Sequence, residues 1–507
     1  MAGSHPDRAA SDASAGATSP RGTHRLTFLA LGALGALGPA LLVGLVLRAR
    51  CFQAYAYALD SCGFVWAVQD GFLPHAPYLV YLWLGRFVSL FMPADVALST
   101  ISFTAGMTAI VLLSLIVHQQ TRSWFAAGIA GVAYAVFPTA VWFSTLQEVY
   151  TPAAAISLGA MLAALGSGKR RAALAGVLFG GAVATHLGVL FLAPAFALAL
   201  LWARRGALER FVAATVGATL LPAAGIAYVA WVMPSAAREK VGLIGYLSGL
   251  KPEVVPDITL GASAVQALRN ALDLSIGRGI PALVVAALAL CAVIRLPRVG
   301  VFWLVFTAPY LAYETWIGWC VDPGVHALFA GPAFAALLAC GVSCAAGLTV
   351  GSGRKIATGI GGVVVALSLL PAANLSWGLA TRVGSRAAYL ASEPVATLVW
   401  IRNHLPKDVV VFQPRSLDNT TLVPAYSRRR PIIFLDGKYL IFDNEPGTPI
   451  NLDHHSLLTE EVLARLVRER TTFVSLTPDP PIPAMGGATW RPVGPVYVLE
   501  TGRNEGN

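Results

Sequence analysis

The chain has 507 residues, of which 56% are hydrophobic and 12% are charged, and its formal net charge is +10. Because ordinary soluble domains carry about 25% charged residues, this composition excludes a soluble globular protein and indicates an integral membrane protein. The basic residues lie mostly in short loops between apolar runs, where they set membrane orientation, so we predict no nucleic-acid partner.

Apolar runs dominate the chain up to about residue 380. Residues 1–25 are small and polar and predict a disordered cytoplasmic tail. Residues 26–380 predict a polytopic α-helical membrane domain, because their uncharged runs can cross a hydrocarbon layer of ~30 Å. The first run is too long for a signal-peptide core, so we expect it to be retained as a span. We predict about eleven spans. In chain order they cover residues 26–47, 95–117, 124–143, 151–167, 172–187, 189–203, 209–232, 280–294, 300–318, 327–347 and 356–376.

The basic loops predict the orientation of these spans. With the N-terminus inside, Arg122, the Lys169–Arg171 run and the later basic loops fall on the cytoplasmic side. This assignment requires residues 78–91 to form a helix at the outer interface instead of a span. Arg48 and Arg50 are exceptions to the rule. The exoplasmic side then receives residues 51–93, 234–278 and 386–507, together with the turns at 144–152 and His186 and the loop 319–329.

The composition changes at the end of the chain. From Arg386 onward charges, prolines and β-branched clusters return, and residues 386–507 predict a small soluble exoplasmic α/β domain. We expect this domain to recognise an acceptor or to cover the mouth of the active site. Its predicted helices cover residues 393–406 and 459–470, and its predicted short strands cover residues 408–414, 430–436, 471–477 and 494–500.

Four ionisable residues near the exoplasmic side are candidates for chemistry. Asp60 follows the first span among aromatic residues; a solvated loop acid is the simpler interpretation, but an acid held at such an interface loses solvent and becomes a better base. Glu148 is either an acid at a helix start or a functional group. His186 is either bonded to a neighbouring carbonyl or functional. Glu314 lies inside a predicted span, where an acid is functional or pairs with an arginine.

Cysteines and metal ligands give weaker signals. Cys51 and Cys62 are assigned to the oxidising side and are the nearest pair in sequence, so one disulfide between them is an option. No ligand set has a recognised metal spacing, and we predict no metal site and no cofactor, with a divalent metal left open as an alternative. Phosphate loops and dinucleotide fingerprints are absent from the sequence.

Three motifs resemble a known family. The segments "DSCGF" with "PHAPYLVYLWLGRF", "VWFSTLQEVY" and "THLGVLFLAPAFAL" resemble, in order, the GT-C superfamily of membrane glycosyltransferases. The resemblance is greatest to the bacterial branch related to protein O-mannosyltransferases and covers roughly residues 50–200. By this resemblance, Asp60 matches the acid of the first exoplasmic loop. The expected substrate-binding positions are His75 of the H-x-P element, Glu148 and Tyr150 of the E-V-Y element, and His186 of the His-Leu pair.

The sequence departs from the family at two places. Cys62 and Gly63 stand where the family usually shows glycine and then a glutamate, and residues 78–80 replace a Gly-Tyr-Pro stretch. An inactive GT-C-like scaffold therefore stays as an alternative interpretation.

The resemblance implies a mannosyltransferase-like enzyme in a bacterial inner or plasma membrane. It would move a sugar from a polyprenyl-phosphate donor, held among membrane lipids, to a hydroxyl of an acceptor protein, lipid or glycan. Polyprenyl phosphate is a good leaving group, so the reaction needs a general base, Asp60, and a cation for the phosphate. The candidate cations are Arg86, Arg238, Lys240 and Arg269.

A transporter or flippase of lipid-linked glycans is the other alternative. Transporters place their sites near the membrane midplane and often contain internal repeats. We find no repeat, and Glu314 is the main ionisable residue within a span.

Overall fold

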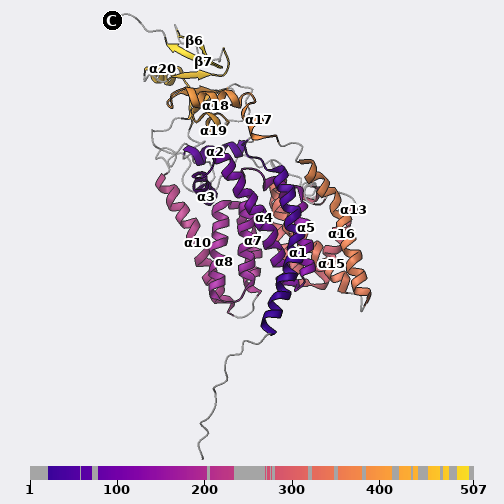
Figure 1. Ribbon diagram of the computed structural model, residues 1–507. Helices are drawn as coiled ribbons and strands as arrows, with labels where there is room; N and C mark the ends of the chain where they lie inside the picture. Colours follow the sequence, from indigo (N-terminus) through magenta and orange to yellow (C-terminus); the bar gives the residue numbers. More distant parts are fainter. Residues whose placement is uncertain are drawn as a thin grey trace, which may run out of the picture.

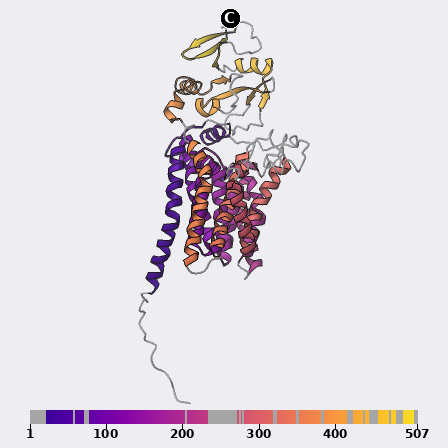
Figure 2. The ribbon, with the colours of Figure 1, turned by 90° about the vertical axis from the view of Figure 1, so that its right-hand side faces the viewer.

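Helices form a long bundle, and an α/β domain stands on one end of it (Figure 1). Helix α1 begins at the end of the bundle that lies farthest from this domain, as a second view also shows (Figure 2). The computed structural model describes residues 21–56, 59–70, 78–202, 206–232, 269, 271–273, 276, 280–317, 323–347, 352–379, 384–413, 422–435, 438–442, 455–468, 472–478 and 488–501.

Five helices of the described part contain segments long and apolar enough to cross a membrane. They are α1 (Arg21–Cys51), α4 (Ala94–Thr121), α10 (Ala207–Val232), α15 (Pro323–Gly347) and α16 (Ser352–Leu379). Outward-facing leucines such as Leu208 and Leu367 leave an apolar surface for lipid. The chain is a multi-pass membrane protein.

Shorter apolar helices complete the bundle, and each predicted span coincides with helical structure. These elements are α5 (Trp124–Val136), α6 (Pro138–Phe143), α7 (Tyr150–Leu165), α8 (Lys169–Thr185), the 3₁₀-helix η1 (Leu187–Leu192), α9 (Ala193–Leu201), α13 (Ile280–Arg295) and α14 (Pro297–Ile317).

The helix predicted over residues 124–143 is interrupted. Phe137 has extended backbone angles (φ −64°, ψ 126°) and separates α5 from α6, because the residue before a proline avoids the helical region and Pro138 has no N–H to donate. Arg48 is fully buried and donates hydrogen bonds to the carbonyls of Ala135 (3.1 Å) and Ala140 (3.3 Å) beside this break. Arg48 is therefore an internal hydrogen-bond donor, which explains why it departs from the positive-inside rule.

The described parts of residues 51–93 include two helices at the end of the bundle that faces the α/β domain (Figure 1). Helix α2 spans Leu59–Asp70 and α3 spans Leu79–Ser89. Residues 61–68 of α2 are all buried, as expected of a helix with no polar face. Helix α3 exposes Leu84 and Phe87, which suits the predicted helix at the membrane interface.

The C-terminal domain contains a mixed sheet of seven strands in the order β4-β3-β2-β1-β5-β7-β6. Strand β1 is parallel to β2 and β5, and the other pairs are antiparallel. The elements are α17 (Arg386–Leu390), α18 (Val395–His404), β1 (Val410–Phe412), α19 (Leu422–Ser427), β2 (Arg430–Leu435), β3 (Lys438–Phe442), β4 (His455–Leu457), α20 (Glu460–Arg468), β5 (Phe473–Ser475), β6 (Ala488–Val493) and β7 (Val496–Thr501).

Helices cover both faces of this sheet. Val411 packs in the cluster that contains α2, α18 and α19, whereas Val410 and Phe412 pack with Leu463 of α20, because successive residues of a strand point to opposite faces. Helices α18 and α19 thus lie between the sheet and the bundle (Figure 1). The sequence predicts α18, α20, β1, β2, β5 and β7, and it misses α17, α19, β3, β4 and β6.

The disulfide suggested for Cys51 and Cys62 is wrong. Both residues are described and buried, and no disulfide joins them. The thiol of Cys51 lies 3.8 Å from the carbonyl oxygen of Ser376, because helix packing directs it into the bundle.

Candidate functional site

Glu148 lies at the centre of the candidate site, in the turn between α6 and α7. Glu148 is only 5% exposed, which is unusual for a residue with a carboxylate. The Ser61 hydroxyl donates a hydrogen bond to Glu148 Oε1 (3.1 Å), and the Ser102 hydroxyl donates to the Glu148 carbonyl oxygen (3.1 Å). Helix α7 can begin directly after this turn because Pro152 stands in its first turn.

Asp60 is adjacent in the chain to Ser61, which bonds to Glu148. Asp60 precedes Ser61 and lies in the first turn of α2, where the helix dipole favours a negative charge. The side chain of Asp60 is outside the described part of the chain. The backbone of Asp60 therefore lies one residue from the group that bonds to Glu148, and the role of Asp60 stays a prediction.

Tyr81 of α3 and Ser102 of α4 border the same buried group. Burial raises the pKa of Tyr81, and the nearby Glu148 carboxylate adds to this rise. The phenol consequently stays neutral and can act as a hydrogen-bond donor within this wall of the site.

His186 lies at the break between α8 and η1. Its backbone is extended (φ −154°, ψ 119°) while its N–H still bonds to the carbonyl of Ala182 (2.9 Å). A Cβ at Gly188 would lie 2.7 Å from the imidazole Cε1 atom, so only glycine lets the ring fold back over η1. The hydroxyl of Tyr310 donates to the Gly188 carbonyl (2.9 Å) and fixes this short turn.

Aromatic rings connect His186 with the surroundings of Glu148. The Tyr150 ring meets the His186 ring edge-on, with centroids 5.1 Å apart, and Tyr150 follows Glu148 by two residues. On the other side Tyr78 is parallel to His186 at 6.2 Å, and Phe64 of α2 meets Tyr78 at 5.1 Å. Glu148, Tyr150 and His186 are therefore gathered at one end of the bundle, next to α2.

The other predicted residues have varied outcomes. Arg86 is half-buried and donates to the carbonyl of Ala67 in the last turn of α2 (3.2 Å). Arg269 is exposed, and within the part of the chain that the structure describes, no hydrogen bond or ion pair joins it to Glu148 or His186. His75, Arg238 and Lys240 lie outside the described residues, as do most of residues 234–278 and the side chains of Asp70 and Glu314.

A buried hydrogen-bond network beneath the site was not predicted. The side-chain amide of Gln147 donates to the Gln53 carbonyl (2.8 Å) and to the Ser99 hydroxyl (2.6 Å). Ser99 itself donates to the Gln53 carbonyl. The sequence gives one indication of this network: Ser99 and Ser102 are three residues apart in an apolar helix, and residues at this spacing share a helix face.

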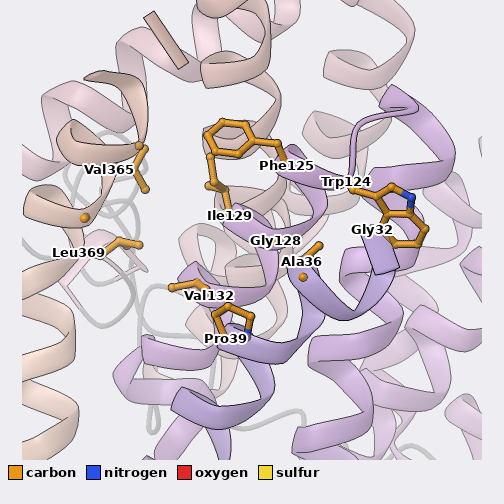
Figure 3. Close-up of a pocket in the computed structure, with 13 residues that line it drawn as sticks. Gly32, Ala36, Pro39, Trp124, Phe125, Gly128, Ile129, Val132, Val365 and Leu369 are labelled. Carbon is orange, nitrogen blue, oxygen red and sulfur yellow. The ribbon is translucent and has the colours of Figure 1, made fainter. Parts of the chain in front are cut away.

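Two apolar cavities lie in the bundle walls. One of about 490 Å³ lies between α3, α4, α7 and α8, and its threonines turn their hydroxyls back to their own helix, as Thr104 does to the Thr100 carbonyl (2.8 Å). The other, of about 420 Å³, lies between α1, α5 and α16, where Ile129 and Val132 lie toward Leu369 and Trp124 lies beside Gly32 (Figure 3). Neither is lined by a carboxylate or histidine. Within the described residues, no three His, Cys, Asp or Glu side chains gather as a metal site.

Comparisons with known proteins show likeness in structure. No known family profile matches the sequence, and no curated protein matches it. ArnT from Cupriavidus metallidurans bound to undecaprenyl phosphate has a TM-score of 0.61 and 12% sequence identity, over 96% of this chain and 99% of that chain.

Archaeal structures are also similar. The oligosaccharyltransferase AglB from Archaeoglobus fulgidus, in complex with an inhibitory peptide and a dolichol-phosphate, has a TM-score of 0.52 and 14% identity, over 87% of this chain and 69% of that chain. The apo form of the Archaeoglobus fulgidus oligosaccharyltransferase also has a TM-score of 0.52 and 14% identity, over 79% of this chain. This chain therefore spans 64% of the length of that oligosaccharyltransferase. The chain thus has the GT-C fold, as the resemblance implied, whereas the O-mannosyltransferase-related branch stays a prediction.

Proposed function

We propose that the protein is a glycosyltransferase that moves a sugar from a polyprenyl-phosphate donor to a hydroxyl of an acceptor protein, lipid or glycan. The observation that carries this proposal is the buried carboxylate of Glu148, bonded to Ser61 beside Asp60 at the covered end of a GT-C bundle. The names of the similar structures include undecaprenyl phosphate and dolichol-phosphate, which supports a polyprenyl-phosphate donor. A mannosyl group is the sugar that the sequence resemblance favours.

The positions of the basic residues support an exoplasmic site in a bacterial plasma membrane. Helix α7 starts beside the site and α8 returns to it, so Lys169 at the start of α8 lies at the opposite end of the bundle. There Lys169 pairs with exposed Glu209 (2.9 Å). Since basic loops stay in the cytoplasm, Glu148 and the C-terminal domain face the other side.

The proposed reaction is a direct displacement at the anomeric carbon. The acceptor oxygen forms a bond to this carbon while the bond to the phosphate oxygen breaks, and the hydroxyl proton passes to Asp60. Polyprenyl phosphate leaves with the bonding electrons, and a cation such as Arg86 or Arg269 stabilises its charge. Glu148, Tyr150, His186 and His75 bind the sugar and the acceptor.

The apolar cavity between α3, α4, α7 and α8 supports a lipid donor. It lies against α3, next to the proposed site, and its lining has the apolar chemistry that a prenyl chain requires.

An inactive scaffold is the second candidate function. It is favoured by Cys62 and Gly63, which replace the second acid of the family within buried helix α2. Sugar transfer by the purified protein, with a panel of polyprenyl-phosphate sugars, separates an enzyme from a scaffold.

The variant Asp60→Asn tests the proposed base, because it keeps the size of the side chain and removes the proton acceptor. Loss of a general base lowers the rate by about 10²–10⁴-fold, and we expect a fall of this size in kcat with little change in donor KM. The matched control is Asp70→Asn at the other end of α2, which we expect to stay within a few-fold of wild type. Equal activity of Asp60→Asn and wild type would remove Asp60 from the mechanism and make Glu148 the next candidate base.

A further inference from the structure

Residues 52–56, called here the 52–56 segment, lead from α1 toward the start of α2. Hydrogen bonds from the bundle hold the first part of this segment. The N–H of Gln53 donates to the Thr145 carbonyl (3.2 Å), and the Gln147 amide donates to the Gln53 carbonyl (2.8 Å). Thr145 and Gln147 belong to the turn that carries Glu148. The bundle therefore fixes the beginning of this segment, next to α1.

The C-terminal domain holds the other end of the same segment. Tyr426 of α19 donates its hydroxyl proton to the Ala56 carbonyl (2.7 Å), and the N–H of Gly384 donates to the Tyr55 hydroxyl (3.2 Å). The ring of Tyr389 in α17 stacks on the ring of Tyr55 with centroids 4.2 Å apart. Ala56 is fully buried by these contacts. The last described residues before α2 are thus bound by the domain and not by the bundle alone.

An ion pair fastens the domain to the bundle beside this segment. Arg386 binds the carboxylate of Asp95 with two nitrogens, from Nε to Oδ2 (3.1 Å) and from Nη2 to Oδ1 (3.3 Å). The Asp95 side chain is 5% exposed, and the Arg386 side chain is 36% exposed. Two parallel bonds to a shielded carboxylate give a firm and directional contact.

Helix α2 itself is covered by the domain. Cys62 is fully buried in the cluster that α2 shares with α18, α19 and β1. Helix α19 packs directly on α2, and Tyr426 of α19 belongs to the same buried cluster as Cys62. Access of a reagent to Cys62 therefore reports whether α19 is seated on α2.

We propose that Arg386 and Tyr426 are positioning residues: by docking the C-terminal domain on the 52–56 segment, they fix the first turn of α2, which carries Asp60 and Ser61. This inference rests on the proposed function for its effect on catalysis. Because Ser61 bonds to Glu148, a shift of this turn moves both acids of the site relative to each other. Sugar transfer consequently depends on how the domain is seated on α2.

The test uses the full-length protein with Cys62 as the sole cysteine kept of the six. The variants are Arg386→Glu, which repels Asp95, Tyr426→Phe, which removes one hydroxyl, and their combination; Arg386→Lys keeps the cation. Lys407→Glu, an exposed charge reversal in the same domain, is the matched control. The rate of N-ethylmaleimide labelling of Cys62 and the kcat and KM for a polyprenyl-phosphate sugar are measured in membranes at equal expression.

We expect the double variant to label about 10-fold faster or more and to lose roughly 10–100-fold in kcat, since small misplacements of reacting groups cost this much. Arg386→Lys should recover most of both values, and Lys407→Glu should match wild type. Unchanged labelling in the double variant, or faster labelling with unchanged kcat, would overturn the positioning role. A wild-type protein that transfers none of the sugars refutes the proposed function alone, because the labelling comparison uses no substrate and still decides whether the domain holds α2.

Discussion

The buried Arg48 offers the sharpest test of how the bundle is held together. Its guanidinium donates to the carbonyls of Ala135 and Ala140, which lie on the two sides of the break at Phe137. Replacement by methionine removes these bonds at a cost of about 1–3 kcal/mol for each carbonyl, but it also relieves the cost of a cation in the membrane, about 2.5–3.5 kcal/mol. The two effects nearly cancel, so Arg48→Met is a poor test.

The variant Arg48→Lys separates the loss of hydrogen bonds from the cost of the buried charge. The positive charge stays, whereas the planar guanidinium group with its forked N–H donors is lost. A single ammonium cannot reproduce the fork geometry, and the loss of one bond from a charged donor costs about 1.5–3 kcal/mol. At roughly 2 °C per kcal/mol, the lower end of the range for large domains, the Tm should fall by about 3–6 °C.

The measurement is the thermal unfolding of the purified protein in detergent, followed by tryptophan fluorescence. Arg50→Lys is the matched control, because the exposed Arg50 only stacks over Trp377 at 4.0 Å, and we expect almost no change there. If both lysine variants unfolded at the same temperature as wild type, the argument that Arg48 satisfies the α5–α6 break would be refuted.

Two further predictions concern helix packing and orientation. Gly176→Ala places a Cβ against the Ala214 carbonyl oxygen of α10 and should lower the Tm by several degrees, whereas Gly359→Ala, with no atom within 4 Å, should not lower it in the same unfolding assay. Cysteines introduced at exposed Ser167 and Lys407 should react with an impermeant maleimide on intact cells only at position 407; labelling at position 167 alone would reverse the proposed orientation.

Much of the candidate site could be chosen from residue type and membrane side. Asp60, Glu148 and His186 are polar residues at the ends of apolar runs, and the topology argument assigns all of them to one face. Their partners could not be chosen in this way. Ser61 and Glu148 are 87 residues apart, and their hydrogen bond depends on how α2 rests against the turn after α6.

Local sequence patterns are enough to predict the long apolar helices and four of the seven described strands, because the length and period of apolar runs are local properties that the membrane and the core both require. The contacts of the polar residues, in contrast, depend on how distant segments pack together. Arg48, an exception to the positive-inside rule, donates hydrogen bonds to two carbonyls that are 87 and 92 residues away in the sequence. Asp95 forms an ion pair with Arg386, which is 291 residues away. Such contacts form because buried polar groups must find partners, and which partner is within reach is set by packing between helices and not by any local pattern.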